Sequence, residues 1–231
     1  MFEKSLLRDK RILITGGGSG LGAAMGRRFL ELGAELVICG RRLELLEKAA
    51  AEMRTASGGN ASAIACDIRD GAAVDAMMDQ IWRDAPLDIL VNNAAATFIA
   101  KTEQLSFRAA DAILAPTLHG AMYCTIAAGK RWIEGGHSGV VLSILSTSTI
   151  TGRAFTVPSA MAKSALLAMT KSLAVEWGPK IFAPSRSRRA RFRHRAPRAS
   201  FAPKVATPAG PRAIRSVASA IIASLPILRA S

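Results

Sequence analysis

The 231-residue sequence has few aromatic residues, three cysteines and no acidic residue after Glu176. The cysteines are far apart in apolar segments, which excludes a disulfide framework and predicts reduced core residues without a metal site. No uncharged apolar run approaches the roughly 20 residues that a membrane-spanning helix needs. The start, MFEKSLLRDK, carries charges of both signs, unlike a secretory signal. We therefore expect a cytoplasmic protein with no membrane partner.

The absence of acids divides the chain near residue 180. Residues 1–180 hold 20 Lys and Arg and all 17 Asp and Glu, whereas residues 181–231 hold 11 Lys and Arg and no acid. The formal charge of +14 thus belongs to an Arg/Ala/Pro-rich tail, whose composition predicts disorder. The tail lacks interleaved aromatics and a groove-binding helix, so we expect no specific nucleic-acid partner. The predicted domains are 1–180 and the tail, 181–231.

Residues 11–177 alternate short apolar runs with longer amphipathic stretches. Val/Ile/Leu-rich runs separated by helical patterns indicate a parallel sheet covered on both faces, an α/β doubly wound, Rossmann-type fold. The predicted strands are 11–15, 35–39, 62–66, 88–91 and 139–145. The predicted helices are 21–32, 43–56, 71–84, 106–133 and 158–177, with Pro116 expected to kink the fourth or to mark its start. Ligands are expected at the carboxyl ends of the strands.

A glycine-rich turn joins the first strand to the first helix in RILITGGGSGLG. Glycines here allow a tight turn, close approach of a pyrophosphate and packing of helix on strand, while the helix N-terminus attracts the anion. A dinucleotide site is therefore favoured over a structural turn. The expected cofactor contacts in this turn are Gly16, Gly17, Gly18, Ser19, Gly20, Leu21 and Gly22.

The ends of the next strands suggest which dinucleotide binds. Arg41 and Arg42 follow the second strand, where an acid would bind the ribose of NAD and an arginine suits the 2′-phosphate of NADP. Asp67 and Ile68 follow the third strand and are placed to meet the adenine, and Asn92 ends the fourth. We expect NADP(H), with a pair of solvated arginines as the alternative.

The motifs TGGGSGLG, CDIRD and DILVNNAA, in this order, resemble the short-chain dehydrogenase/reductase family over about residues 1–180. The resemblance implies a catalytic serine at Ser146 and a lysine at Lys163 that grips the nicotinamide ribose. The family's tyrosine position is Ser159, and the one tyrosine of the chain, Tyr123, matches no catalytic position.

The segment GRAFTVPSAMAKSALLAMTKSLAVEWG resembles the 2,4-dienoyl-CoA reductase branch, which has a serine at that position. That branch implies reduction of an unsaturated acyl-CoA by hydride from NADPH, with a tyrosine and an asparagine that are Ser148 and Thr97 here. Either water completes the proton relay, or the chemistry differs. The resemblance implies substrate contacts at Arg69, Thr97, Phe98, Ser106 and Ser159, and catalytic roles for Lys163, Ser159, Ser146 and Ser148. Phe98 is equally compatible with a core position.

Two alternatives to this reductase remain open. A non-catalytic NADP-binding protein would keep the fold without the phenol, and a 3-oxoacyl or ketone reductase would use the same cofactor. Family members commonly form tetramers through the long helices, so the resemblance implies a homo-oligomer in a full-length form.

The tail matches no part of the family, whose members continue with a sixth strand, an APG turn and a final strand. A sheet without these elements would be truncated at its C-terminal edge. One permitted set of codons for residues 181–197, read from its third base, encodes LRAVAVAPGPFPPPGA, which contains such a turn. We hypothesise that residues after about Lys180 are a frameshifted translation.

Overall fold

The computed structural model describes residue 3 and residues 5–181, all within one compact unit. Helices and strands alternate through this part of the chain, as the hydrophobic pattern predicts. The strands are β1 (Arg11–Thr15), β2 (Glu35–Gly40), β3 (Ala61–Ala65), β4 (Ile89–Asn92) and β5 (Val140–Ser143). The helices are α1 (Gly20–Glu31), α2 (Leu43–Ser57), α3 (Gly71–Asp84), η1 (Thr102–Gln104), α4 (Phe107–Leu114), η2 (Ala115–His119), α5 (Gly120–Gly135), α6 (Ser148–Thr151) and α7 (Val157–Ile181).

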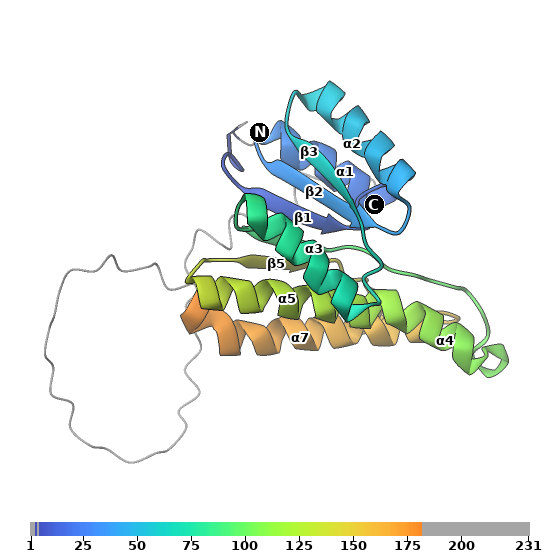
Figure 1. Cartoon of the computed structure of the whole chain (residues 1–231). Helices are drawn as coiled ribbons and strands as arrows, with labels where there is room; N and C mark the ends of the chain where they lie inside the picture. The colour runs from blue at the N-terminus through green and yellow to red at the C-terminus, as the bar shows by residue number, and fades with distance from the viewer. Residues whose placement is uncertain (1–2, 4, 182–231) are drawn as a thin grey trace, which may run out of the picture. The chain divides into compact units, whose positions relative to one another are not determined.

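The five strands form one parallel sheet in the order β3-β2-β1-β4-β5. The chain leaves β1 towards one edge and returns after β3 to the other side of β1, so the order reverses there (Figure 1). Such a reversal leaves a crevice at the carboxyl ends of the strands beside it. The doubly wound, Rossmann-type fold is confirmed.

Alternate residues of the central strands face opposite helical layers. Leu36 packs against α1 and α2, because a Cβ added to Gly26 of α1 would meet its Cδ2 atom and Met53 of α2. Leu13 and Leu90 instead belong to a buried cluster with residues of α3 and α5. The near-continuous apolar strands therefore reflect burial on both faces.

The predicted helix 106–133 is divided into three parts. Helix α4 ends at Leu114, and the next five residues, with Pro116 among them, form a π-helical segment before α5 begins at Gly120. Proline has no N–H to donate and its ring crowds the preceding turn, which disfavours a continuous α-helix. The irregularity expected at Pro116 is present.

Helices α5 and α7 lie side by side beneath the sheet (Figure 1). Gly129 of α5 faces Trp177 of α7 so closely that an added Cβ would lie 2.2 Å from the indole. The fully buried Trp132 anchors α5, because its indole N–H donates to the Leu87 carbonyl. The first of these contacts fixes the C-terminal turns of α7 against α5.

One stretch, Phe107–Gly135, is long and apolar enough to span a membrane by length and composition alone, although it carries charged residues near both ends. Half of its apolar window is buried inside the fold, against β4, α3 and α7. Its composition is therefore explained by its place in the core.

The three cysteines are free and buried, as expected for core residues. Burial raises the pKa of Cys66 to about 11 and that of Cys124 to about 12, so both thiols stay protonated at neutral pH.

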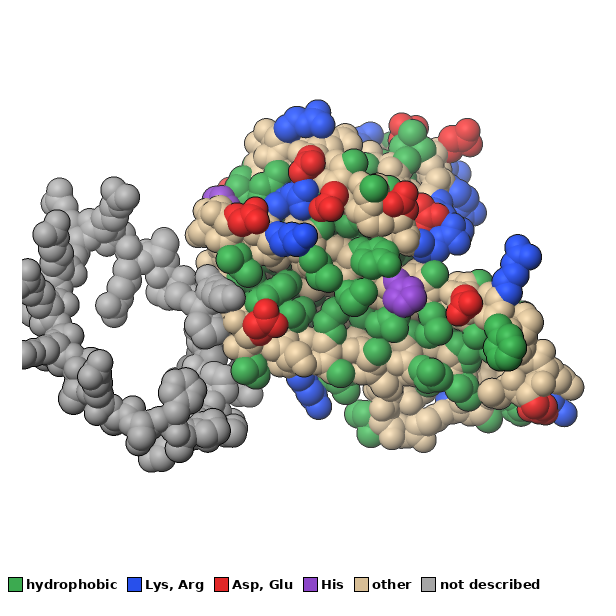
Figure 2. All heavy atoms as spheres, turned by 60° about the horizontal axis from the view of Figure 1, so that its bottom comes forward, with side chains coloured by type: hydrophobic (Ala, Val, Ile, Leu, Met, Phe, Trp, Pro, Cys, Tyr) green, Lys and Arg blue, Asp and Glu red, His purple; other side chains and the backbone are tan. Residues whose placement is uncertain are grey.

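The expectations for the basic tail after Ile181 lie outside the described residues. Within the described part of the chain, β5 pairs with β4 alone and forms an edge of the sheet. Figure 2 shows charged side chains mainly in the upper part of the visible face and hydrophobic ones gathered in its middle and lower parts.

Candidate cofactor and active site

A cavity of about 410 Å³ opens at the carboxyl ends of the strands, where the strand order reverses. Residues from four loops line it, namely the turn after β1 and the segments that follow β2, β3 and β4. The lining residues predicted from the sequence are Gly16, Gly18, Ser19, Arg41, Arg42, Asp67, Ile68 and Arg69. The fold thus brings together residues that are up to 100 positions apart in the sequence, from Gly16 to Pro116.

The turn after β1 depends on glycine for two separate reasons. Gly16 and Gly20 have φ values of +66° and +53°, a region that side chains rarely adopt. Gly22 has no room for a side chain, because an added Cβ would lie 2.4 Å from the Gly16 carbonyl oxygen. Gly17 is equally confined, by Ile38 of β2. The glycines therefore shape the turn and fasten α1 to the end of β1.

The N-terminus of α1 is open towards an anion. Ser19 is the N-cap, but its side chain accepts no capping hydrogen bond, and the first turn contains no acidic residue. A Cβ added at Gly20 would meet no atom within 4 Å, and Leu21 beside it is half-buried. Exposed N–H groups at the positive end of a helix dipole fit a pyrophosphate. The loop therefore fits the dinucleotide expected from the sequence.

Exposed arginines and one ion pair line the next part of the cavity. Arg41 and Arg42 are exposed where β2 gives way to α2. The Arg69 Nε donates to both oxygens of Asp67, at 2.8 and 3.0 Å, and its Nη2 donates to Oδ2. The Arg69 hydrogen bond lowers the pKa of Asp67, and the charge of Arg41 lowers it further. Asp67 is consequently a carboxylate at neutral pH.

Ile68 gives the cavity an apolar surface beside this ion pair. The side chain is 6% exposed and rests on the start of α5, where a Cβ on Gly120 would approach it to 2.6 Å. An aliphatic side chain next to a carboxylate suits the face and the amino group of an adenine. Both residues lie on the cavity wall, where an adenine contact stays a prediction.

The amide after β4 that lines the cavity is Asn93 rather than the predicted Asn92. Asn92 is 2% exposed and its Nδ2 donates to Thr125 of α5 at 2.8 Å. Asn93 donates from Nδ2 to the Thr15 carbonyl at 2.9 Å, and the Thr15 hydroxyl accepts from the Asn93 N–H at 3.1 Å. Alternation along the strand sends the two neighbouring asparagines to opposite sides. Asn92 therefore positions the strand, and its predicted cofactor contact is corrected.

Sequence reasoning missed Thr15 as a residue of the site. Its hydroxyl also accepts from the Ala94 N–H at 3.0 Å, so one side chain fixes the loop after β4 to the end of β1. Farther along that loop, the Ala96 N–H donates to Thr117 in the π-helical segment at 3.0 Å. A polar residue at the end of an otherwise apolar strand was the available signal.

Lys163 lies inside the fold at the carboxyl end of β5. It is 6% exposed, and its Nζ donates to the Ile144 carbonyl at 2.6 Å. Desolvation by burial lowers the pKa of this lysine. Ser159 stands one helical turn before it on α7, so the two side chains share a helix face.

Two of the predicted serines form a hydroxyl pair after β5. The Oγ atoms of Ser146 and Ser148 lie 2.8 Å apart, and Ser148 begins the short helix α6, which the sequence analysis did not predict. No phenol joins them, because Tyr123 lines a small cleft between α3 and α5 and stacks on His119. The polar groups on this side of the site are thus aliphatic hydroxyls and one ammonium.

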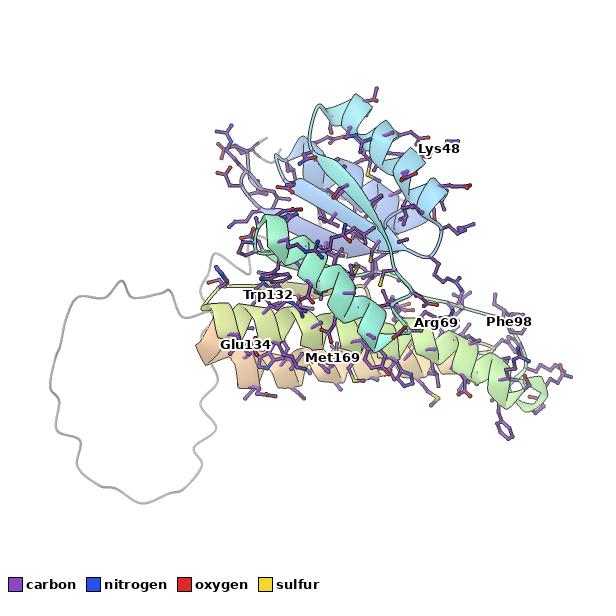
Figure 3. The ribbon with its side chains drawn as sticks, in the orientation of Figure 1. Lys48, Arg69, Phe98, Trp132, Glu134 and Met169 are labelled. Atoms are coloured by element: carbon purple, nitrogen blue, oxygen red, sulfur yellow. The ribbon has the colours of Figure 1, made fainter. Side chains whose placement is uncertain are left out.

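The predicted substrate residues lie in different environments. Phe98 is 56% exposed, which excludes the core position that the sequence left open, and Thr97 beside it is exposed. Figure 3 shows Phe98 on the segment that leads to α4, and Arg69 where the chain passes from β3 to α3. Ser106 is the N-cap of α4, since its Oγ accepts from the Ala109 N–H at 3.2 Å. Capping accounts for this serine without a substrate.

The family described as short chain dehydrogenase matches residues 10–183, three quarters of the chain. The match includes the glycine turn, the cavity and the Ser159–Lys163 face. The chain belongs to the short chain dehydrogenase family. The match ends close to the position where acidic residues disappear from the sequence.

This short chain dehydrogenase is similar in sequence to two curated relatives. An uncharacterized oxidoreductase of Caenorhabditis elegans is 42% identical over 173 residues, which cover 74% of this chain and 55% of the relative. A probable 2,4-dienoyl-CoA reductase of Bacillus subtilis is 38% identical over 178 residues, which cover 75% of this chain and 68% of the relative. The chain spans about half to two thirds of the length of these relatives.

Solved structures of dehydrogenases superpose on the described fold. A short chain dehydrogenase from Bacillus anthracis is 40% identical with a TM-score of 0.71, covering 74% of this chain and 71% of its own. A gluconate 5-dehydrogenase from Burkholderia cenocepacia in complex with NADP is 30% identical with a TM-score of 0.71, covering 76% and 69%. A xylitol dehydrogenase with bound NAD+ is 26% identical with a TM-score of 0.72, covering 75% and 67%. Dehydrogenases of this fold therefore bind NAD or NADP.

Proposed function

We propose that this short chain dehydrogenase is an NADP(H)-dependent reductase of unsaturated fatty acyl-CoA, of the 2,4-dienoyl-CoA reductase type. The observation that carries the proposal is the Ser146–Ser148 hydroxyl pair, together with Ser159 and the buried Lys163. A set of hydroxyl donors suits the carbonyl of a thioester on which negative charge develops. The name of the Bacillus subtilis relative supports the same substrate class.

In the proposed NADP(H) site, the parts of the cofactor lie along the cavity against different loops. The N–H groups at the start of α1 would bind the pyrophosphate, and Asp67 with Ile68 would meet the adenine. Arg41 and Arg42 would bind the 2′-phosphate, for which guanidinium groups are well suited. No acid stands at the end of β2 to favour the free ribose hydroxyls of NAD.

When bound, NADPH supplies a hydride to the far end of the conjugated dienoyl thioester. The electron pair of the diene then moves towards the thioester oxygen, and we propose that Ser146, Ser148 and Ser159 donate hydrogen bonds to that oxygen. Lys163 would bind the nicotinamide ribose and hold the reacting carbon in position. One proton from water completes the two-electron reduction, since aliphatic hydroxyls are much weaker acids than a phenol.

The proposed homo-oligomer would use the long helices. Ile126 and Ile133 of α5 are 41% and 36% exposed, and Met161 and Val175 of α7 are 57% and 72% exposed. Exposed apolar residues on two adjacent helices suit contact with a second copy.

A non-catalytic NADP-binding protein is the second candidate. The position of Tyr123 between α3 and α5 favours the non-catalytic protein, because the one tyrosine of the chain lies away from the Ser146–Ser148 pair. The pair therefore has no phenol beside it to act as a strong proton donor. A 3-oxoacyl or ketone reductase would share the cofactor half with the leading candidate.

Oxidation of NADPH in the presence of 2,4-dienoyl-CoA, 2-enoyl-CoA, 3-oxoacyl-CoA and simple ketones separates these functions. We expect turnover with the dienoyl thioester. Turnover of the 3-oxoacyl-CoA or the ketones alone would show that the enzyme is a carbonyl reductase and not a dienoyl-CoA reductase. Binding of NADPH without turnover of any compound would favour the non-catalytic protein.

A further inference from the structure

Four charged side chains line the adenosine end of the cavity, and one of them is an acid. Arg41, Arg42 and Arg69 contribute positive charge, and Asp67 is the one carboxylate among the described residues that line this cavity. A 2′-phosphate carries about two negative charges. An uncompensated carboxylate in the same cavity would oppose its binding.

Arg69 donates hydrogen bonds to both oxygens of this carboxylate. Besides the three side-chain hydrogen bonds, the Arg69 backbone N–H donates to Asp67 Oδ1 at 3.1 Å. Both oxygens of the carboxylate are therefore engaged by a residue two positions away in the sequence. The side chains are 44% and 35% exposed, so the pair stands at the cavity wall in contact with solvent.

Arg41 lies within electrostatic reach of Asp67, because its charge also lowers the pKa of that carboxyl group. Without Arg69, Asp67 would remain ionised and Arg41 would be its nearest remaining partner of opposite charge among the cavity residues. An arginine paired with Asp67 cannot give the same hydrogen bonds to a phosphate. The carboxylate would then weaken NADP(H) binding in two ways. It would repel the 2′-phosphate, and it would compete with that phosphate for Arg41.

We propose that Arg69 is a specificity-determining residue that acts through Asp67, keeping this carboxylate neutralised so that Arg41 stays available for a 2′-phosphate. The inference rests on the proposed use of NADP(H) and reassigns Arg69 from acyl-CoA binding to cofactor selection. NADH has the same adenine but lacks the phosphate, so an effect of the Asp67–Arg69 pair on the adenine changes both affinities alike, whereas its effect on the phosphate changes that of NADPH alone. The ratio of the two affinities is the quantity that Arg69 controls.

The test is a double-mutant cycle on the full chain, read by fluorescence titration with NADPH and with NADH. Arg69→Met keeps the aliphatic stem and removes the charge. We expect it to weaken NADPH binding about twofold to fivefold, as suits a partly exposed pair, and to change NADH binding less than that. The double variant Asp67→Asn/Arg69→Met removes the carboxylate as well, and the single variant Asp67→Asn is its reference. We expect the NADPH-to-NADH affinity ratio of the double variant to lie within about twofold of the ratio measured for Asp67→Asn.

Arg83→Met, at an exposed arginine of α3 outside the cavity, controls for the loss of one positive charge. An affinity ratio in the double variant that stays as low as in Arg69→Met would mean that Arg69 binds the phosphate directly, and would overturn the proposal. An unchanged affinity ratio in Arg69→Met would also overturn the proposal. A higher KM for acyl-CoA in that variant would then indicate that Arg69 binds the substrate. Equal affinity of the unaltered protein for NADPH and NADH, or binding of neither, would reject the proposed cofactor itself.

Discussion

At the scale of single residues, Arg41 is expected to select the cofactor by direct contact. Replacing it with alanine removes a charge-assisted hydrogen bond to the 2′-phosphate, which is worth roughly 1.5–3 kcal/mol. Arg41→Ala should therefore weaken NADPH binding about tenfold to a hundredfold and leave NADH binding nearly unchanged. Titration of both nucleotides measures this. Equal losses for the two would contradict the assignment.

Lys163 is expected to be required for turnover and dispensable for folding. Lys163→Met should lower turnover at least about a hundredfold, because the ribose loses its positioning group. The thermal midpoint should change little or rise, since the variant no longer buries an ammonium group. A parallel loss of turnover and midpoint would indicate a structural role.

The pH profile gives a second measure of the same lysine. Burial lowers the pKa of Lys163 in the folded protein, so the proton is lost at a lower pH than from a free lysine. Activity should therefore be retained below that pKa and fall as the pH rises through it, before the ordinary value of 10.5. An activity that increases throughout the alkaline range would contradict a protonated Lys163.

Ser148 tests whether a missing phenol limits proton delivery. Ser148→Tyr places a stronger acid beside Ser146, whose Oγ lies 2.8 Å from that of Ser148. We expect faster turnover of dienoyl-CoA, by about tenfold or more, as general acid catalysis contributes in other enzymes. Ser148→Phe controls for the added ring. Unchanged or slower turnover in the tyrosine variant would show that proton transfer is not limiting.

At the scale of elements, the α5–α7 contact orients the helix that carries Ser159 and Lys163. A Cβ at Gly129 would overlap Trp177 at 2.2 Å, so Gly129→Ala should destabilise the fold by about 1–3 kcal/mol. Gly178 on α7 has no neighbouring atom within 4 Å of an added Cβ. Gly178→Ala is the matched control and should stabilise slightly, because alanine loses less backbone entropy. Urea unfolding compares the two, and equal stabilities would contradict this packing.

At the scale of the whole molecule, the frameshift remains a prediction that sequencing can test. The family match ends at residue 183, and residues 181–231 contain no acid. We expect resequencing around codon 180 to reveal an insertion or deletion. An in-frame product of about 250–280 residues should be soluble, oligomeric and more active, because it would restore a neighbour to β5. An intact reading frame and an active, well-ordered 231-residue protein would contradict this.

The edge of β5 that has no partner strand in the described part of the chain gives the frameshift hypothesis a physical consequence. Within the described part of the chain this strand has one partner, and its sequence VVLS contains no charged residue. An open, apolar edge can pair with other chains. The 231-residue protein should therefore fold poorly and aggregate more readily than the in-frame product, as light scattering would measure.

The sequence by itself determined the features that depend on local interactions. Gly16, Gly20 and Gly22 could be assigned from spacing, because steric limits on the backbone act within a few residues. The five strands and the longer helices followed from hydrophobic periodicity, and the disturbance at Pro116 from its missing N–H. Resemblance to relatives then supplied Ser159 and Lys163, which helical spacing places on one face.

Only the tertiary structure decided the features that depend on contacts between distant segments. Asn92 turns towards Thr125 while Asn93 binds the turn after β1, a choice set by packing across the sheet. Arg69 pairs with Asp67, although the sequence placed one at the substrate and the other at the adenine. Hydrogen bonds between side chains depend on where the backbone brings their atoms, and that position is set by the packing of the whole core.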